Sequence, residues 1–427
     1  MLILIFEKHL LWFRPNGNGG TNFYYYYDEY TWIAGSLAVA WLIWYLVSRY
    51  RRAQRLRRPR RRTNYRLLKQ VIKLKRELSS RYLRPGFSRR IHAVGIGMLD
   101  NGSRYCIQVF INDANEELWT GSGAAALPTS YRGVPVVPIA MPMASFLADA
   151  GSGVTTQYQY PNGIRERQEV IIGGISGANT NLAGQSGTIG YFCTRKTRLP
   201  RRKEICLLSN SHVFADLRKG KVDDGDLIMQ PSPGEPSSNR PIGTLVYYSA
   251  LKFDGNISEP NRVDAALAKL WAPLKHQPLI PLIGAVKGYV ATNDIAIGEA
   301  VRKFGRTTGY TEGHVFSICL DIWIRYDRTG QSAFFQEQFL VEPARPRFNK
   351  FVSGGDSGSL LIDTDQHAIG LVFAGMSELP ESLRSSPDIK AIAKTDPATE
   401  KLKKIEGYGV ANPINEVLDR LKIDLLV

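Results

Sequence analysis

The stretch Ser353–Ser359 constrains this chain most, because it reads Ser-Gly-Gly-Asp-Ser-Gly-Ser and leads directly into the apolar residues Leu360–Ile362. Glycines on both sides of Ser357 permit a tight turn that exposes a hydroxyl and lets backbone N–H groups converge on one point. A hydroxyl is a poor nucleophile unless a neighbouring base takes its proton. The stretch therefore predicts chemistry only if a base lies elsewhere in the chain, and a glycine-rich hairpin loop is the alternative.

Two upstream segments supply a base and an acid. An apolar run that is typical of a strand ends close to His212, and Asp264 precedes a run of small apolar residues. The order His212, Asp264, Ser357, with gaps of 52 and 93 residues, is one in which a base, an orienting carboxylate and a nucleophile occur together. We predict that these three residues are catalytic and that the N–H groups of Gly355 and Ser357 form an oxyanion hole.

These local contexts resemble those of the trypsin/chymotrypsin-like serine proteases. The segments Lys303–Gly313 and Gly370–Gly375 are similar to those of bacterial peptidases related to the plant narrow-leaf-type proteases, and the resemblance covers about residues 180–427. It implies a mainly β fold of two six-stranded antiparallel β-barrels, with the three residues above as a triad. It also implies cleavage of peptide bonds through an acyl-enzyme intermediate, with no cofactor and no metal.

The resemblance further implies a substrate pocket whose base lies six positions before the nucleophile, at Phe351. The walls of this pocket would be Phe373, Ala374, Gly375 and Gly409. A pocket without a buried carboxylate does not select Arg or Lys, because an unpaired buried cation is costly. We therefore expect a small or apolar residue before the cut. The polar stretch Ser377–Glu406 is either a lid over the cleft or an uninvolved surface loop.

The positive charge of the chain is concentrated in one segment. The total of +16 is typical of proteins that bind nucleic acid, but residues 49–90 hold 18 Lys and Arg against one acid, which leaves −1 for the remainder. Residues 51–62 alone contain eight arginines without interleaved aromatic side chains. Anionic lipid headgroups are therefore the favoured partner of this segment, and a membrane-tethered nucleic-acid binder is the alternative.

An uncharged stretch precedes these arginines. Residues 31–47 carry no charge and have Trp32 and Trp44 near their ends, which is typical of a short bilayer-spanning helix. We predict a transmembrane helix over 31–48, with the N-terminus outside and the protease domain in the cytoplasm because the arginines follow the helix. Four scattered cysteines agree with a reducing compartment. A buried core helix or a secretory signal is the alternative.

The predicted organisation of the chain has five parts. They are an N-terminal tail (1–30), the transmembrane helix (31–48), a basic segment with an amphipathic helix (49–86), a small α+β leader domain (87–172) and a trypsin-like peptidase domain (173–427) with barrels at about 186–280 and 281–427. The amphipathic helix has apolar residues at 67, 71, 74, 78 and 82. Such a helix packs on the next domain, lies on a membrane surface, or pairs with a second copy in a homo-oligomer.

Two alternatives concern activity. Ile171–Gly174 resembles the N-terminus that cleavage releases in trypsin zymogens, whose amine pairs with the aspartate before the nucleophile, here Asp356. A plain linker is the other interpretation of that segment. A catalytically silent protease-fold scaffold is a second possibility, although all three triad positions are filled. The function predicted is a membrane-anchored serine endopeptidase that cuts a specific protein or peptide substrate.

Overall fold

The computed structural model describes residues 38–45, 47, 65–84, 91–99, 102–111, 127–146, 163–182, 184–196, 204–220, 222, 226–253, 255–326, 331–376 and 407–427. The predicted tail (1–30), the whole arginine run (49–62) and the polar stretch 377–406 lie outside these residues. The chain divides into two compact units, Met1–Leu56 and Arg57–Val427.

The N-terminal unit is described only at residues 38–45 and 47, which are helical and expose the apolar side chains of Trp41, Ile43 and Trp44. Among the residues that the structure describes, no helix combines the length and the apolar character that crossing a bilayer requires. Only part of the span predicted over 31–48 is therefore described. The structure does not support its crossing of a membrane, which stays a prediction.

The first sheet of the C-terminal unit has seven described strands in the order β19-β7-β8-β11-β10-β9-β6. They are β6 (Ala178–Asn179), β7 (Tyr191–Arg195), β8 (Ile205–Ser209), β9 (Leu227–Gln230), β10 (Arg240–Tyr248), β11 (Ala266–Leu270) and β19 (Ile423–Leu425). All neighbouring pairs are antiparallel. Five of these strands lie within the bounds predicted for the first barrel (about 186–280), whereas β6 precedes them and β19, close to the C-terminus, adds to β7.

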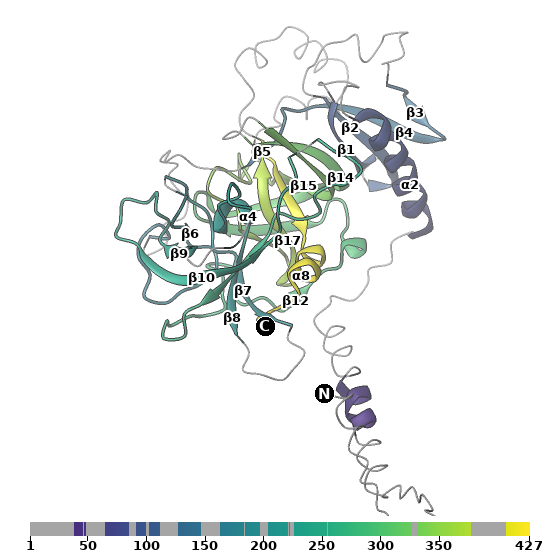
Figure 1. Cartoon of the computed structure of the whole chain (residues 1–427). Coiled ribbons are helices and arrows are strands. Elements are labelled where there is room, and N and C mark those ends of the chain that lie inside the picture. The colour runs from purple at the N-terminus through teal and green to yellow at the C-terminus, as the bar shows by residue number, and fades with distance from the viewer. Residues whose placement is uncertain are drawn as a thin grey trace, which may run out of the picture. The chain divides into compact units, whose positions relative to one another are not determined.

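The second sheet contains a closed ring of six described strands. They are β13 (Ala300–Gly305), β14 (Gly309–Tyr326), β15 (Gln331–Pro343), β16 (Leu360–Asp363), β17 (His367–Gly375) and β18 (Gly409–Pro413). Their order is β13-β16-β17-β18-β15-β14, and β14 pairs again with β13. Closure removes exposed edges, which is how antiparallel barrels avoid unpaired backbone groups. This six-stranded ring agrees with the second barrel predicted from the sequence. Figure 1 labels β14, β15 and β17 of the ring.

The strands of the predicted leader domain extend the second sheet. They are β1 (Ile91–Leu99), β2 (Arg104–Ile111), β3 (Ser130–Tyr131), β4 (Val134–Ala140) and β5 (Ser145–Phe146). Strand β1 pairs with β14, and β5 pairs with both β14 and β17. The leader is thus continuous with the barrel through backbone hydrogen bonds, a connection that the sequence analysis did not predict.

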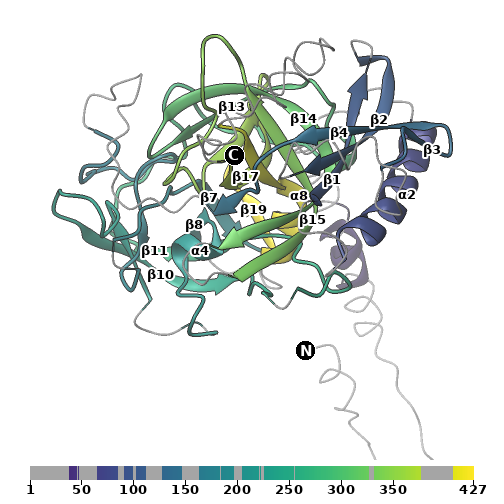
Figure 2. The same ribbon diagram turned by 90° about the horizontal axis from the view of Figure 1, so that it is seen from above.

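Helix α2 (Tyr65–Tyr82) packs on β1 and β2 (Figure 2). It buries Leu68, Val71 and Leu78 in the core cluster that also contains Phe339 of the barrel. Of the three alternatives for the amphipathic helix, the structure shows packing on the next domain. The buried face differs from the predicted one because Leu67 is 41% exposed, whereas Lys75 is fully buried against Asp321.

Three short elements complete the part of the fold that bears on the site. Helix α4 (Ser211–Phe214) follows β8 directly, β12 (Gly288–Tyr289) pairs with β17, and α8 (Ile414–Leu421) follows β18. The largest apolar cluster lies in the first sheet but also includes Phe304, Leu360 and Leu371 of the second. The two sheets therefore share buried side chains at the place where the predicted triad residues lie.

Candidate active site

His212 lies in the one-turn helix α4, directly beyond the end of β8. Its Nδ1 is hydrogen-bonded to Oδ2 of Asp264, and both side chains are buried. The other carboxylate oxygen, Oδ1, accepts the backbone N–H groups of Ser211 (2.6 Å) and His212 (3.3 Å). A carboxylate held in this way fixes the proton of the imidazole on Nδ1, so Nε2 is the basic nitrogen of the ring.

Two asparagines hold the backbone of Asp264, and the sequence analysis selected neither. Asn412 of β18 accepts the N–H of Asp264 (3.0 Å), and it donates from Nδ2 to the carbonyls of Asp264 and Leu371 (both 3.2 Å). Asn210 donates to the same Asp264 carbonyl at 2.7 Å. Asn412 therefore ties the acid of the first sheet to the second sheet. Its only sequence signal is its place before a proline at a strand end.

The turn that carries Ser357 packs against the first sheet. The Ser357 hydroxyl donates to the carbonyl of Phe373 (3.1 Å), and its own carbonyl accepts the N–H of Thr188 (2.8 Å). At Gly358 φ is +95°, and a Cβ added there would clash with the Thr188 carbonyl and the Ser209 hydroxyl. Glycine adopts this conformation and tolerates this approach at no steric cost. Because Ser209 precedes His212 by three residues, the three predicted residues gather where the two sheets meet.

Asp356, which precedes the candidate nucleophile, accepts five hydrogen bonds. Its Oδ2 accepts from Lys303 Nζ (3.0 Å), the Ser353 N–H (3.0 Å) and the Thr308 hydroxyl (2.7 Å). Its Oδ1 accepts the N–H groups of Thr307 (2.9 Å) and Thr308 (3.1 Å). Burial lowers the pKa of the Lys303 ammonium, although the charge of Asp356 acts in the opposite direction. The carboxylate thereby defines the conformation of the turn.

The segment around Ile171 bears on the alternative of activation by cleavage. Ile171 is buried, and its N–H donates to the Lys275 carbonyl at 2.9 Å. Asp356 is paired with Lys303 in the uncut chain, so its carboxylate has a cationic partner without a newly released amine. The geometry favours the linker interpretation of Ile171–Gly174 over a cleavage-activated switch.

The predicted pocket residues fall into two groups. Phe351 is fully buried, and a Cβ added at Gly409 would lie 3.0 Å from its ring; Gly409 in turn pairs in register with Gly375. The structure thus brings Phe351, Gly375 and Gly409 together. The Phe373 ring instead packs on Phe335, with centroids 4.7 Å apart, and lies in a different core cluster that also includes the buried Ala374. The carbonyl of Phe373, rather than its ring, contacts Ser357.

The four cysteines are free thiols, and three of them are fully buried. Burial raises the pKa of Cys106, Cys206 and Cys319 to about 11 in each case. A thiol with so high a pKa is a poor nucleophile at neutral pH because the thiolate is the reactive form. The hydroxyl of Ser357 is therefore the better candidate for covalent chemistry.

Comparison with known proteins also indicates a peptidase. Residues 266–379 match the sequence model of peptidase family S64, and this segment contains Ser357 but neither His212 nor Asp264. No curated protein sequence matches the chain. The resemblance to the narrow-leaf-related branch, which is a finer assignment, stays a prediction.

Several solved structures are similar over 60% of this chain. They include protease A of Thermobifida fusca (18% identity, 99% of that chain, TM-score 0.36), a chymotrypsin of Cellulomonas bogoriensis (18%, 60% of this chain and 98% of that chain, 0.35) and a Nocardiopsis protease (16%, 60% and 99%, 0.36). Likenesses this distant carry no argument by themselves. The match to peptidase family S64 over residues 266–379 confirms the resemblance to the trypsin/chymotrypsin-like serine proteases that the sequence motifs indicated.

Proposed function

We propose that this chain is an endopeptidase in which His212, Asp264 and Ser357 act as a catalytic triad. The observation that carries the proposal is the buried hydrogen bond between His212 Nδ1 and Asp264. The turn that carries Ser357 lies nearby, because Gly358 packs against Ser209, the residue of β8 that precedes the histidine by three positions. A buried carboxylate on Nδ1 directs the basic Nε2 to its proton-transfer partner. The only partner that the sequence places in a nucleophile turn is Ser357.

The reaction begins when the Ser357 hydroxyl exchanges its hydrogen bond to the Phe373 carbonyl for one to His212. Nε2 removes the hydroxyl proton as Oγ attacks the peptide carbonyl, and Asp264 stabilises the imidazolium that forms. The N–H groups of Gly355 and Ser357 bind the oxyanion. The imidazolium then gives its proton to the leaving amine, which departs and leaves the acyl-enzyme. In the second half of the reaction, Nε2 takes a proton from water as the water attacks the acyl carbon, and it returns this proton to Oγ of Ser357 as the ester bond breaks.

The substrate is a protein or peptide with a small or apolar residue before the cut. Support comes from the pocket base proposed at Phe351, whose ring packs against Gly409 with no carboxylate in its place. The walls proposed are Gly375 and Gly409, which pair in register, whereas the side chains of Phe373 and Ala374 lie in a different core cluster.

A fluorophosphonate probe, which reacts with activated serines, tests this function. The wild-type protein should be labelled, Ser357→Ala should not be, and His212→Ala should react at least about 10³-fold more slowly. Ser317→Ala is the matched control, because Ser317 is a buried serine of β14 whose hydroxyl donates to the Ile96 carbonyl. Labelling that persists in Ser357→Ala, or a wild-type protein that is never labelled, would contradict the proposal and favour a silent scaffold.

We further propose that residues 31–48 tether the protease to a membrane, with the protease domain in the cytoplasm. The uncharged stretch and the arginines that follow it support this tether. The full chain should remain with membranes after extraction at alkaline pH, and aspartates at Leu42, Ile43 and Trp44 should release it. A full chain that alkaline extraction releases completely would sink the tether but leave the protease proposal intact.

A further inference from the structure

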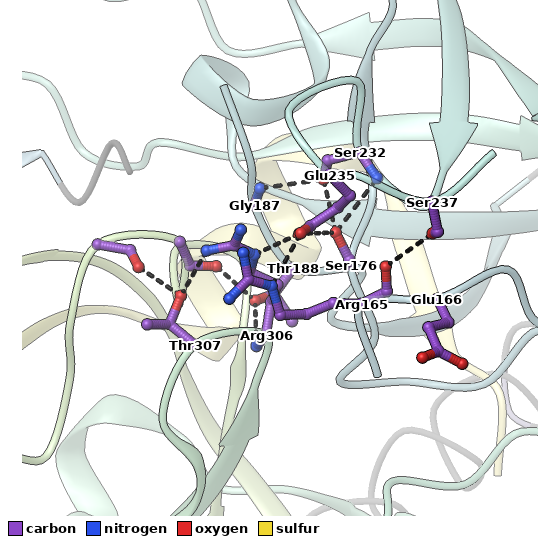
Figure 3. Close-up of polar contacts among 12 residues, drawn as sticks. Arg165, Glu166, Ser176, Gly187, Thr188, Ser232, Glu235, Ser237, Arg306 and Thr307 are labelled. Atoms are coloured by element: carbon purple, nitrogen blue, oxygen red, sulfur yellow. Dashed lines mark hydrogen bonds and ion pairs between the residues drawn. The ribbon is translucent and has the colours of Figure 1, made fainter. Parts of the chain in front are cut away.

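Figure 3 shows a polar network around Arg306 and Glu235. Hydrogen bonds from this network to Gly354 and Gly355 place it next to the turn that carries Ser357. At its centre, Arg306 Nε donates to Oε1 of Glu235, and neither side chain is exposed. Arg306 follows β13 of the second sheet, whereas Glu235 lies between β9 and β10 of the first. A buried ion pair is weak evidence for stability by itself because desolvation offsets the attraction. Its surroundings therefore have to explain it.

Both carboxylate oxygens of Glu235 accept further hydrogen bonds. Oε1 also accepts the Ser176 hydroxyl (2.8 Å), and Oε2 accepts Arg165 Nε (2.8 Å). Burial acts to raise the pKa of Glu235, but the two arginines and Ser176 outweigh it and the pKa is lowered. Glu235 is thus an anion at neutral pH and holds the guanidinium of Arg306 in place.

The Arg306 side reaches the nucleophile turn through two threonine hydroxyls. Nη1 of Arg306 donates to the Thr307 hydroxyl (3.0 Å), which donates to the Gly354 carbonyl. The backbone N–H of Arg306 donates to the Thr188 hydroxyl (3.0 Å), which donates to the Gly355 carbonyl (2.8 Å). Because a guanidinium and a backbone N–H can only donate, each hydroxyl accepts from Arg306 and turns its single proton to the carbonyl. Two consecutive carbonyls of the turn are held in this way.

The Gly354 carbonyl and the Gly355 N–H belong to one trans peptide and point in opposite directions. Thr307 holds the carbonyl on one side of that peptide, so the N–H points to the other. A Cβ added at Gly355 would clash with the Thr307 hydroxyl and lie 2.9 Å from Arg306 Nη1, so the network lies directly against this peptide. A peptide rotated by half a turn would present an oxygen, instead of a donor, to the developing negative charge.

We infer that Thr307, Thr188 and Arg306 are positioning residues that keep the Gly355 N–H directed at the substrate oxyanion, and that Glu235 keeps Arg306 in register. This inference rests on the proposed function, because it assigns a role within the oxyanion hole. The network contains residues from both sheets, so the packing of the two sheets against each other fixes the orientation of the Gly354–Gly355 peptide.

Thr307→Val and Thr307→Ser form the decisive pair of variants. Valine keeps the shape and loses the hydroxyl, whereas serine keeps the hydroxyl. With an Ala-Ala-Pro-Ala p-nitroanilide as substrate, Thr307→Val should lower kcat by about 10²-fold with KM nearly unchanged, because an oxyanion donor acts in the transition state. Affinity for the matching peptide aldehyde, which forms a tetrahedral oxyanion, should fall by a similar factor. Thr307→Ser should restore both values to within about 3-fold of wild type.

Separate outcomes distinguish this inference from the proposed function. If wild-type protein neither hydrolyses the substrate nor reacts with a fluorophosphonate, the proposed function fails. The positioning role is overturned if wild type is active and the kcat of Thr307→Val equals that of Thr307→Ser and Ser317→Ala. It is also overturned if Thr307→Val raises KM and leaves kcat unchanged. Should Thr307→Val not fold, Glu235→Gln serves in its place: it keeps the shape and loses the charge, and a folded Glu235→Gln protein with unchanged kcat also overturns the inference.

Discussion

Two buried lysine–aspartate pairs have the same charges and the same burial but different surroundings. Lys303 and Asp356 lie 3.0 Å apart beside the nucleophile turn, and Lys75 and Asp321 lie 2.8 Å apart between α2 and β14; all four side chains are fully buried. Asp356 accepts four hydrogen bonds in addition to the lysine, all from its own turn and from the loop after β13. Asp321 accepts one backbone N–H in addition, from Glu337 at 3.1 Å.

The difference teaches what each pair does. A carboxylate that accepts hydrogen bonds from its own turn and from a neighbouring loop determines how these two segments are folded against each other, so Lys303 neutralises a charge that shapes the turn around Ser357. A carboxylate that meets a lysine from another element determines where that element docks. Both pairs should matter for stability, because removal of one partner leaves a buried charge unpaired. Only the first should matter for turnover.

The largest effect is expected from Lys303→Met. It leaves Asp356 buried without its cation, which costs about 3–5 kcal/mol in the free energy of unfolding. The turn then depends on a carboxylate whose charge is no longer compensated, and kcat should fall by about 10²-fold or more in the molecules that remain folded. Urea unfolding and turnover of the peptide p-nitroanilide measure the two effects. Folded Lys303→Met protein with wild-type kcat would break the comparison.

Lys75→Met should produce a loss of stability of similar size, about 3–5 kcal/mol, with kcat per folded molecule unchanged. The reason is that Asp321 is left unpaired while the nucleophile turn keeps all its partners. Lys73→Met is the matched control, because Lys73 lies on the same helix with an exposed side chain. A kcat that falls in Lys75→Met but not in Lys73→Met would show that the leader is coupled to the active site.

The smallest effect is expected when both members of the docking pair become apolar. Lys75→Met with Asp321→Leu should regain most of the lost stability, since a well-packed apolar pair often replaces a buried ion pair at little or no net cost. Lys303→Met with Asp356→Leu should not regain activity, because the turn keeps no acceptor for its N–H groups. A double-mutant cycle for each pair measures this contrast. Recovery of wild-type activity in the Lys303→Met, Asp356→Leu double variant would contradict it.

The sequence by itself was sufficient to predict a mainly β chain and to select His212, Asp264 and Ser357. These residues stand out locally, because a nucleophile turn needs glycines and a buried strand needs an apolar run, and both demands are met within a few neighbouring residues. The predicted roles of the three residues are what the labelling experiment tests. The six-stranded ring of the second barrel could also be predicted, through the resemblance that these motifs carry.

Contacts between distant segments were decided by the tertiary structure alone. Thr188 and Glu235 carry no local pattern, and Asn412 has only its place before a proline. Lys75 is not one of the apolar positions of the amphipathic helix, but it is buried against Asp321. The leader strands were expected to stand apart, and they continue the barrel sheet through β1 and β14. The physical reason is that a polar side chain can be buried only where its partner arrives, and the partner is brought there by strand pairing across long stretches of chain. Periodicity and turn residues predict the secondary structure of a segment and the face that it buries, but not which distant segment packs against that face.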